Sequence, residues 1–381
     1  MKHILLLVII CALFFNKFSF AEAKEEPTTS RTGKGNPFAL VEDFPENPEG
    51  DPELLNPGNL KMFLHAPSDM PENAPVVFVL HGCSKGAAKI KEWAGWNELA
   101  DKHKFYVVYP QQQKQRIGKI SKTGNFLLCF NWSGTNGQMK KRGEGEDKSI
   151  IDMISYLKDN NYSINEERVF ITGFSAGGAM ANLMLAYWPD KFAGGASIAG
   201  VPFHCATTVK EGLGCMGVKP NFATRSNSGP GCEGMGEACM DPKLKRTPEG
   251  WKDLVVKYGK QNYSGPYPLM MAWHGGRDQY VDDDNMQEIM KQWTAVHGID
   301  QKADNEKPIL KETYTDHEYS EYRDSDGNPK VATLLIPRMF HSIPVEPGNG
   351  KDQGGIESGR YSVDYGLHSS YYTAKFWGLV K

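Results

Sequence analysis

A serine lies between two glycines at residues 173–177, in the order Gly-Phe-Ser-Ala-Gly. A serine becomes an exposed nucleophile when a strand turns sharply into a helix, and flanking glycines keep colliding side chains out of that turn. Residues 168–174 form an apolar run typical of a buried strand, and residues 176–188 are typical of an apolar helix. This context predicts a nucleophile elbow at Ser175; the alternative is a glycine-rich turn with a helix-capping serine.

A nucleophilic serine needs a base, and the base needs a carboxylate to orient it. Where the nucleophile stands on an elbow, the acid and then the histidine follow it along the chain. Asp278 comes just after a predicted strand at 269–273, so we predict it as the acid. The aspartates at 282–284 are the alternatives, but they stand where they would cap the next helix, which is the ordinary role of such residues.

Four histidines follow the predicted acid: His297, His317, His341 and His368. His341 follows the apolar run "VATLLIP" on a loop that a substrate could reach, so we predict it as the base. The other three lie at a helix end, inside a predicted hairpin and near the start of the last helix. His81 and His274 precede glycines at strand ends, where we expect them to brace loops through hydrogen bonds.

The negative charge that develops on an ester oxygen needs two N–H donors. We expect one from Ala176, the residue after the serine, and the other from Cys83 in the loop "LHGCSKG". A disulfide at Cys83 would fix this loop, so that its donor needs no reorganisation during the reaction.

The segments that must hold these residues alternate between apolar runs and helical patterns. Strands are predicted at 60–67 (an edge strand), 74–82, 105–110, 168–174, 192–200 and 268–276, and helices at 89–104, 146–160, 176–188, 283–298 and 369–380. The alternation predicts an α/β protein with a parallel central sheet and helices on both faces. Residues 311–337 predict a hairpin, and residues 140–148 a solvated loop and helix start.

The first residues have the features of a secretory signal peptide. A basic start, an apolar run at 4–15 and the sequence "AEA" at 21–23 predict cleavage after residue 23. Residues 24–55 are rich in Pro, Glu, Gly and Asn, and predict a mobile leader before one catalytic domain at 56–381. We therefore expect export to the medium or the periplasm, with no membrane partner after cleavage.

Charge and cysteine usage narrow the class of protein. The chain has 43 basic and 46 acidic side chains, and this near-balance argues against a nucleic-acid partner. An even number of cysteines after the signal peptide predicts disulfides, and the lack of a Cys-x-x-Cys pair disfavours zinc. We expect no metal and no cofactor. Many pairings are open, and we favour Cys83–Cys129, Cys205–Cys215 and Cys232–Cys239, the last two in a surface excursion at about 205–250.

Several segments together resemble the esterase family of poly(3-hydroxybutyrate) (PHB) depolymerases, an α/β-hydrolase group related to feruloyl and acetylxylan esterases. They are "NPGNLKMFLHAP", "VVFVLHGCSKGA", "GWNELADKHKFYVVYPQQQ", "CFNW", "RVFITGFSAGGAMANLML", "AWHGGRDQYV", "MFHSIPVEPG" and "AKFWGL". The resemblance implies a serine esterase of the α/β-hydrolase fold, with Ser175, Asp278 and His341 as its triad. It also implies a Cys83–Cys129 bridge and backbone donors from Cys83 and Ala176.

The resemblance further implies substrates that are short hydroxyalkanoate esters or polyester oligomers, cleaved through an acyl-enzyme. Trp132 in "CFNW" is a candidate substrate contact; the alternative is a tryptophan packed within its loop. A feruloyl or acetylxylan esterase acting on plant polysaccharide is the nearest alternative function. A serine peptidase and a non-catalytic binding protein on the same scaffold are alternatives from other classes. The sequence does not predict the oligomeric state.

Overall fold

The computed structural model describes residues 38–114, 123–125, 127–134, 139–217, 240–304, 310 and 316–380. The chain divides into two units, residues 1–31 and 32–381, and every described residue belongs to the second. The predicted signal peptide, Cys232 and Cys239 lie outside the described residues. Within the described part of the chain, no helix has the length and apolar character needed to cross a membrane.

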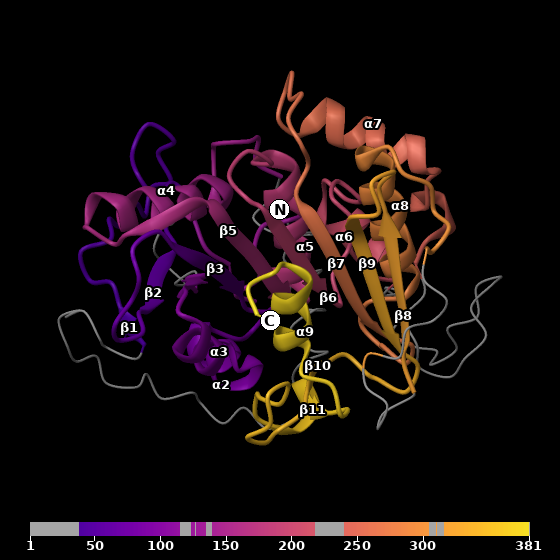
Figure 1. Ribbon diagram of the computed structural model, residues 1–381. Coiled ribbons are helices and arrows are strands. Elements are labelled where there is room, and N and C mark those ends of the chain that lie inside the picture. Colours follow the sequence, from indigo (N-terminus) through magenta and orange to yellow (C-terminus); the bar gives the residue numbers. More distant parts are fainter. Residues whose placement is uncertain are drawn as a thin grey trace. The chain divides into compact units, whose positions relative to one another are not determined.

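A nine-stranded sheet forms the centre of the domain, in the order β1-β2-β4-β3-β5-β6-β7-β9-β8 (Figure 1). Its strands are β1 (Ala39–Leu40), β2 (Lys61–His65), β3 (Ala74–Leu80), β4 (Tyr106–Gln111), β5 (Ile164–Phe174), β6 (Gly194–Ile198), β7 (Leu269–Gly275), β8 (Glu318–Arg323) and β9 (Pro329–Ile336). The six neighbouring strands β4, β3, β5, β6, β7 and β9 pair in parallel. The antiparallel strands are β1 and β2 at one side of the sheet and β8 at the other. The predicted mostly parallel sheet is confirmed, as is the predicted hairpin, which is formed by β8 and β9.

Helices cover both faces of this sheet. They are α2 (Ala87–Ala94), α3 (Trp96–His103), α4 (Glu146–Asp159), α5 (Ala176–Tyr187), α6 (Val209–Met216), α7 (Pro248–Tyr258), α8 (Asp284–His297) and α9 (Ser369–Phe376). A second small sheet pairs β10 (Ile343–Val345) with β11 (Ser362–Asp364) in parallel.

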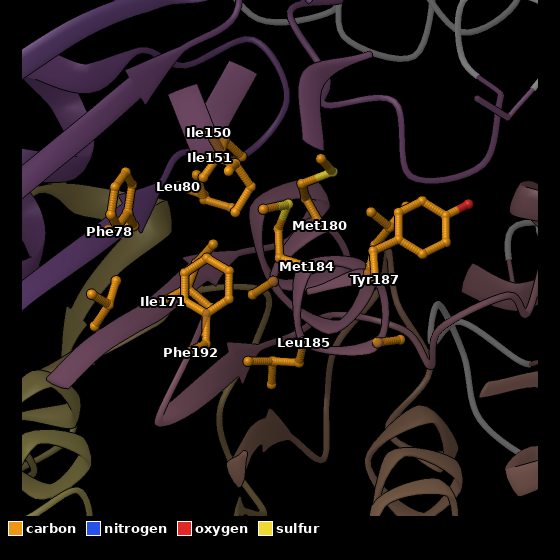
Figure 2. Packing of buried hydrophobic residues seen from close by; sticks show 14 of the residues in the cluster. Phe78, Leu80, Ile150, Ile151, Ile171, Met180, Met184, Leu185, Tyr187 and Phe192 are labelled. Carbon is orange, nitrogen blue, oxygen red and sulfur yellow. The ribbon is translucent and has the colours of Figure 1, made fainter. Parts of the chain in front are cut away.

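Alternation along β3 shows how the two cores form. Phe78 and Leu80 pack with residues of α4, α5 and α8, and Figure 2 shows part of this cluster. Val77 and Val79 point to the opposite face and pack with residues of α2, α3 and α9. All seven residues of β3 are buried, as expected of a central parallel strand covered on both sides.

The predicted helix at 89–104, the predicted edge strand and the predicted start of the domain each differ from the structure, for a physical reason. The predicted helix at 89–104 is two helices, because Gly95 has φ +70° and a Cβ there would lie 2.5 Å from the backbone nitrogen of Gly355. The predicted edge strand is β2, but β1 pairs beside it. Buried Val41 and Phe44 also join the core, so the ordered domain begins before residue 56. Neither contact has a local sequence signal, because both depend on segments that meet only in the folded chain.

Candidate active site

The backbone at Ser175 has the geometry predicted for an elbow. β5 ends at Phe174 and α5 begins at Ala176, so the serine is the only residue between strand and helix. Its φ of 58° and ψ of −121° are strained for a residue with a side chain. The Ser175 N–H donates to Ile198 O at 2.8 Å, which ties the bend to the neighbouring strand β6.

The flanking glycines allow this bend for the predicted reason. A Cβ at Gly173 would lie 2.4 Å from the carbonyl carbon of Gly177, across the turn. A Cβ at Gly177 would lie 2.4 Å from Leu80 O, at the end of β3. Real Cβ atoms do not approach backbone this closely, so a side chain at either position would push α5 away from the sheet.

The predicted acid and base form a direct hydrogen bond. His341 Nδ1 lies 2.6 Å from Asp278 Oδ2. The other oxygen of Asp278 accepts the N–H groups of Tyr280 and Val281, at 2.8 and 2.9 Å. The His341 ring lies 4.7 Å from the ring of Phe174, the residue before the serine. The structure thus brings all three predicted triad residues to one end of the sheet.

No hydrogen bond joins Ser175 Oγ to His341 in the part of the chain that the structure describes. In unliganded enzymes such a contact is often long and tightens only when a substrate is bound. The Asp278–His341 contact leaves Nε2 as the ring nitrogen that is available to the serine.

The residues around Asp278, the predicted acid, stabilise its ionised carboxylate. Burial alone would raise the pKa of Asp278, but His341, through its charge and its hydrogen bond, lowers it below the ordinary value. His274 contributes to this lowering from 3.6 Å. Burial lowers the pKa of His274 itself, and its Nε2 contacts Val281 O at 2.9 Å. Asp278 can therefore stabilise a positive charge on His341, while His274 braces the turn as predicted.

The alternative acids and bases have other partners. Asp282 accepts the N–H groups of Met240 and Asp284 at 2.6 and 2.8 Å, and Asp284 forms an ion pair with Lys245. The rings of His297 and His368 contact the carbonyls of Pro268 and Ala94, and His317 accepts the N–H of Leu310. None of these groups reaches the predicted serine in the described structure, and no group of three or more described His, Cys, Asp or Glu residues is arranged to hold a metal.

The loop predicted to carry the second oxyanion donor lies against the serine. Cys83 and Cys129 form a disulfide, and Ser84 N–H donates to Leu127 O at 2.5 Å. A Cβ placed on Gly82 would lie 3.3 Å from Ser175 Cβ. The N–H groups of Cys83 and Ala176 find no acceptor among the residues that the structure describes, so both remain available to a ligand.

A buried glutamate that the sequence did not suggest holds this loop. Glu146, in the first turn of α4, accepts the Asn131 N–H at 2.7 Å and the Gln112 side-chain amide at 2.5 Å. The same amide donates to Cys129 O at 3.1 Å. Burial raises the pKa of Glu146 to about 7, against the hydrogen bonds from Asn131 and Gln112. The predicted solvated helix start is therefore wrong for Glu146 and for the buried Asp147 beside it.

Trp132 belongs to the packing of the excursion. It is 7% exposed and joins a cluster with Ala176, Cys205 and Trp251. A Cβ on Gly212 would lie 3.3 Å from its ring. The structure thus favours the packed alternative over a direct substrate contact.

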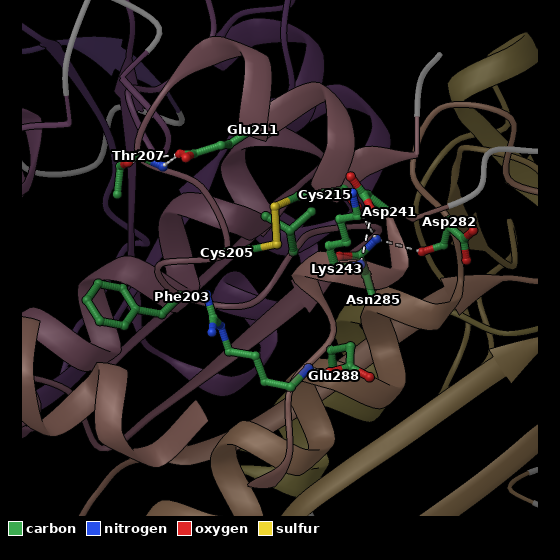
Figure 3. Close-up of a disulfide and its surroundings, with 12 residues drawn as sticks. Phe203, Cys205, Thr207, Glu211, Cys215, Asp241, Lys243, Asp282, Asn285 and Glu288 are labelled. Atoms are coloured by element: carbon green, nitrogen blue, oxygen red, sulfur yellow. Dashed lines mark hydrogen bonds between the residues drawn. A yellow bond between two sulfur atoms is a disulfide. The ribbon is translucent and has the colours of Figure 1, made fainter. Parts of the chain in front are cut away.

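A second disulfide holds the excursion, as Figure 3 shows. Cys205, which precedes α6, is bonded to Cys215 in the last turn of that helix. Asn285 of α8 donates to Cys215 O at 2.8 Å, which attaches the disulfide to the body of the domain. The predicted Cys205–Cys215 pairing is confirmed, and Cys232–Cys239 lies outside the described residues.

A separate cavity of about 770 Å³ lies beside the other end of α5. Its lining includes Tyr187 of α5 and the cations Lys140, Arg142, Lys257 and Lys260. Because α5 has 12 residues and a helix rises about 1.5 Å per residue, this cavity is about 18 Å from the elbow. It is therefore not where an ester would meet the predicted nucleophile.

Comparison with known proteins adds a family to this geometry. A family model described as "Esterase PHB depolymerase" matches residues 60–226. The chain is 40% identical over 325 residues to the poly(3-hydroxyalkanoate) depolymerase C of Paucimonas lemoignei, a match that covers 85% of this chain and 68% of that one. It is 31% identical to a probable acetylxylan esterase A of Aspergillus clavatus, over 76% of this chain and 82% of that one. Among solved structures, an acetyl xylan esterase from Aspergillus awamori matches with a TM-score of 0.63 at 19% identity, over 90% of this chain and 99% of that one, which supports the α/β-hydrolase fold.

Proposed function

The chain belongs to the esterase family of PHB depolymerases and is a carboxylic ester hydrolase, and from this premise we propose that it is a serine esterase of short hydroxyalkanoate esters or polyester oligomers. The observation that carries the mechanism is the 2.6 Å contact between His341 and Asp278 beside the Ser175 elbow. It supplies the base and its orienting carboxylate in the order and place that an elbow serine requires.

In the first half of the reaction, Ser175 Oγ attacks the ester carbonyl carbon and its proton passes to His341 Nε2. The carbonyl oxygen becomes an oxyanion and accepts the N–H groups of Cys83 and Ala176. The tetrahedral intermediate then expels the alcohol, whose oxygen takes the proton from His341. The acyl group remains on Ser175 as an ester.

In the second half, water attacks the acyl carbon and gives a proton to His341. The same two N–H groups hold the second oxyanion. When the intermediate collapses, Ser175 Oγ leaves with the proton from His341, and the carboxylic acid is released. Asp278 stays ionised throughout and stabilises the positive imidazole ring, in keeping with its lowered pKa.

The substrate class is supported by the identity to the depolymerase of Paucimonas lemoignei, which exceeds that to the acetylxylan esterase of Aspergillus clavatus. An acetylxylan or feruloyl esterase activity is the second candidate, because both names occur among the relatives. A panel of hydroxybutyrate oligomers, acetylated xylan and feruloyl arabinose would rank these candidates by kcat/KM. A higher kcat/KM on either plant-derived ester than on the oligomers would overturn the proposed substrate.

The catalytic role is tested by one substitution. Ser175→Ala is expected to lower kcat on p-nitrophenyl butyrate about 10⁶-fold, because removing the nucleophile leaves only binding and the oxyanion donors. Ser68→Ala is the matched control, since Ser68 is exposed in a turn beyond β2. Equal rates for wild type and Ser175→Ala would refute the mechanism.

Export is part of the same proposal. The signal-peptide features of residues 1–23 and the two disulfides of the described structure support an oxidising compartment. N-terminal sequencing of the protein recovered outside the cytoplasm should begin at Lys24. Recovery only from the cytoplasm, with Met1 retained, would contradict this part.

A further inference from the structure

Two cations beside the predicted triad have no ion-pair partner in the described parts of the chain. Lys85 lies two residues after Cys83 in the loop that follows β3, and Arg360 lies in the short 3₁₀ turn Gly359–Tyr361. By contrast, Lys89, four residues further along the chain in α2, pairs with Glu92 at 2.8 Å. Cations without a carboxylate in the same region of a site are candidates to bind an anionic ligand.

Both cations lie against one shared aromatic ring, that of Tyr361. Lys85 Nζ is 4.6 Å from the ring centre of Tyr361, and Arg360 Cζ is 5.8 Å from the same centre. Arg360 is also 5.1 Å from the ring centre of Tyr280. The rings therefore hold two positive charges in one place, since a cation is attracted to the face of an aromatic ring.

The same rings contact the predicted base and the elbow. The Tyr280 ring centre lies 5.2 Å from that of His341. The Tyr361 ring centre lies 6.5 Å from that of Phe174, which precedes Ser175. The two cations are thus next to the group that would give a proton to the departing alcohol.

We propose that Lys85 and Arg360 form a subsite for the free carboxylate of a hydroxyalkanoate oligomer, on the side of the leaving alcohol. The inference rests on the proposed function and names the part of the substrate that the site recognises. In the last ester of such an oligomer, the leaving alcohol is itself a hydroxy acid, and its carboxylate is only a few bonds from the ester oxygen. Because His341 protonates that oxygen, the carboxylate must lie near His341, where the two cations are.

The two side chains suit different parts of this task. A guanidinium can bind both oxygens of a carboxylate, whereas an ammonium acts as a point charge. With the Gln279 amide oriented to donate to Arg277 O, its oxygen accepts from Arg360 Nη2 at 3.0 Å, which holds the guanidinium in place. Burial, and secondly the charge of Lys89, lower the pKa of Lys85, so a bound carboxylate would relieve a cost that is already present.

The subsite predicts a preference among esters of the same oligomer. The ester next to the free acid end would be cleaved first, so that one hydroxy acid is released in each cycle. An interior ester carries no carboxylate at this distance and would gain nothing from the two cations.

The test compares the hydroxybutyrate dimer acid with its methyl ester, which has the same scissile bond and no charge. We expect wild type to have the higher kcat/KM on the acid, mainly through KM, with an advantage that shrinks as salt is added. Arg360→Gln and Lys85→Gln should each lower the ratio of the acid to the methyl ester about 10- to 100-fold, the usual effect of a lost charged hydrogen bond. Lys89→Gln is the matched control, because it removes a cation only four residues further along the chain that already pairs with Glu92, and it should leave the ratio unchanged.

Each outcome decides the proposal. An equal kcat/KM of wild type on the acid and the methyl ester would overturn it, and so would variants that slow both substrates equally. A selective loss by Arg360→Gln on acetylated glucuronoxylan, with none on the dimer acid, would mean that the cations read a sugar carboxylate instead. Failure of the proposed function is distinguishable, because wild type would then hydrolyse p-nitrophenyl butyrate but neither dimer, and the subsite would fall with it.

Discussion

Two loop regions are fixed in the same way and for different purposes. The oxyanion loop (residues 82–86 with 127–132) follows β3, and the excursion (residues 205–217 with 240–250) follows β6. Each has a disulfide and a backbone N–H that donates to a buried carboxylate near the start of a helix. In the oxyanion loop this carboxylate is Glu146, the first residue of α4, and in the excursion it is Asp282, two residues before α8. Because β3 and β6 run in the same direction, both regions emerge at the same edge of the sheet.

The difference lies in what each region leaves unpaired. The oxyanion loop presents the Cys83 N–H, which has no acceptor among the described residues. The excursion instead packs its apolar side chains, among them Ala206 and Met240, into a buried cluster that also contains Trp132 and Ala176. The same kind of attachment therefore holds a donor ready for chemistry in one region and, in the other, a packed wall beside the elbow residue Ala176. Damage to the oxyanion loop should lower kcat as well as stability. Damage to the excursion should lower stability and raise KM, with little change in kcat.

Between these two regions, the largest effect is expected from removal of the oxyanion-loop disulfide. Cys83→Ser with Cys129→Ser opens a link that spans 46 residues, and loop-closure entropy predicts a loss of about 4 kcal/mol in the free energy of unfolding. A misplaced Cys83 N–H should also lower kcat on p-nitrophenyl butyrate about 100-fold, the usual cost of one oxyanion donor. Urea unfolding and steady-state kinetics on the same preparation measure both. An unchanged kcat would show that the loop does not need this link for chemistry.

The matched change in the excursion should lower stability and raise KM for oligomers, but leave kcat nearly unchanged. Cys205→Ser with Cys215→Ser opens a link of 10 residues, for which the same argument predicts about 3 kcal/mol. We expect kcat on the small p-nitrophenyl ester to stay within about twofold, and KM for oligomers to rise, because the wall loosens while the donor stays in place. If this variant lost kcat as the first one does, the two regions would not be separable.

The sequence was sufficient to identify candidate residues where the pattern that marks them lies next to them in the chain. An apolar strand, a glycine-flanked turn and an apolar helix adjoin Ser175 in the chain, and Asp278 and His341 each follow a strand that can be recognised alone. The same alternation predicts the mostly parallel sheet, and the even cysteine count predicts disulfides but does not fix their pairing.

The sequence was insufficient where a residue's role depends on a distant partner. Gln112 and Glu146 are separated by 34 positions, and nothing near Glu146 distinguishes it from a solvated first-turn acid until the fold buries it. Gly95 breaks a helix because Gly355 approaches it from the other end of the domain. Such contacts are set by tertiary packing, which overrides local pattern and propensity.

Glu146 provides a pH test of the oxyanion loop. Burial is the main cause that raises the pKa of Glu146 from 4.5 to about 7. The folded protein therefore holds this proton more tightly than the unfolded chain does, and the resulting stability is fully present below about pH 4.5 and is lost as the pH rises through about 7. Wild type should therefore lose on the order of 2–3 kcal/mol relative to Glu146→Gln between pH 5 and pH 8. Urea unfolding at intervals across this range gives the difference, and parallel curves would contradict it. A several-fold lower kcat is expected for the variant, since the loop is less firmly held.

Asp282 provides the matched and smallest test, in the excursion. Asp282→Asn leaves one of the N–H groups of Met240 and Asp284 without its charged acceptor, so we expect a loss of about 1–2 kcal/mol in the free energy of unfolding. Asp284→Asn is the control, because an exposed pair with Lys245 should cost less than about 1 kcal/mol. Since Asp282 holds the wall and not the donor, kcat on p-nitrophenyl butyrate should stay at the wild-type value, in contrast to Glu146→Gln. A fall in kcat equal to that of Glu146→Gln would mean that the excursion also positions the catalytic groups, and that the two attachments serve one purpose.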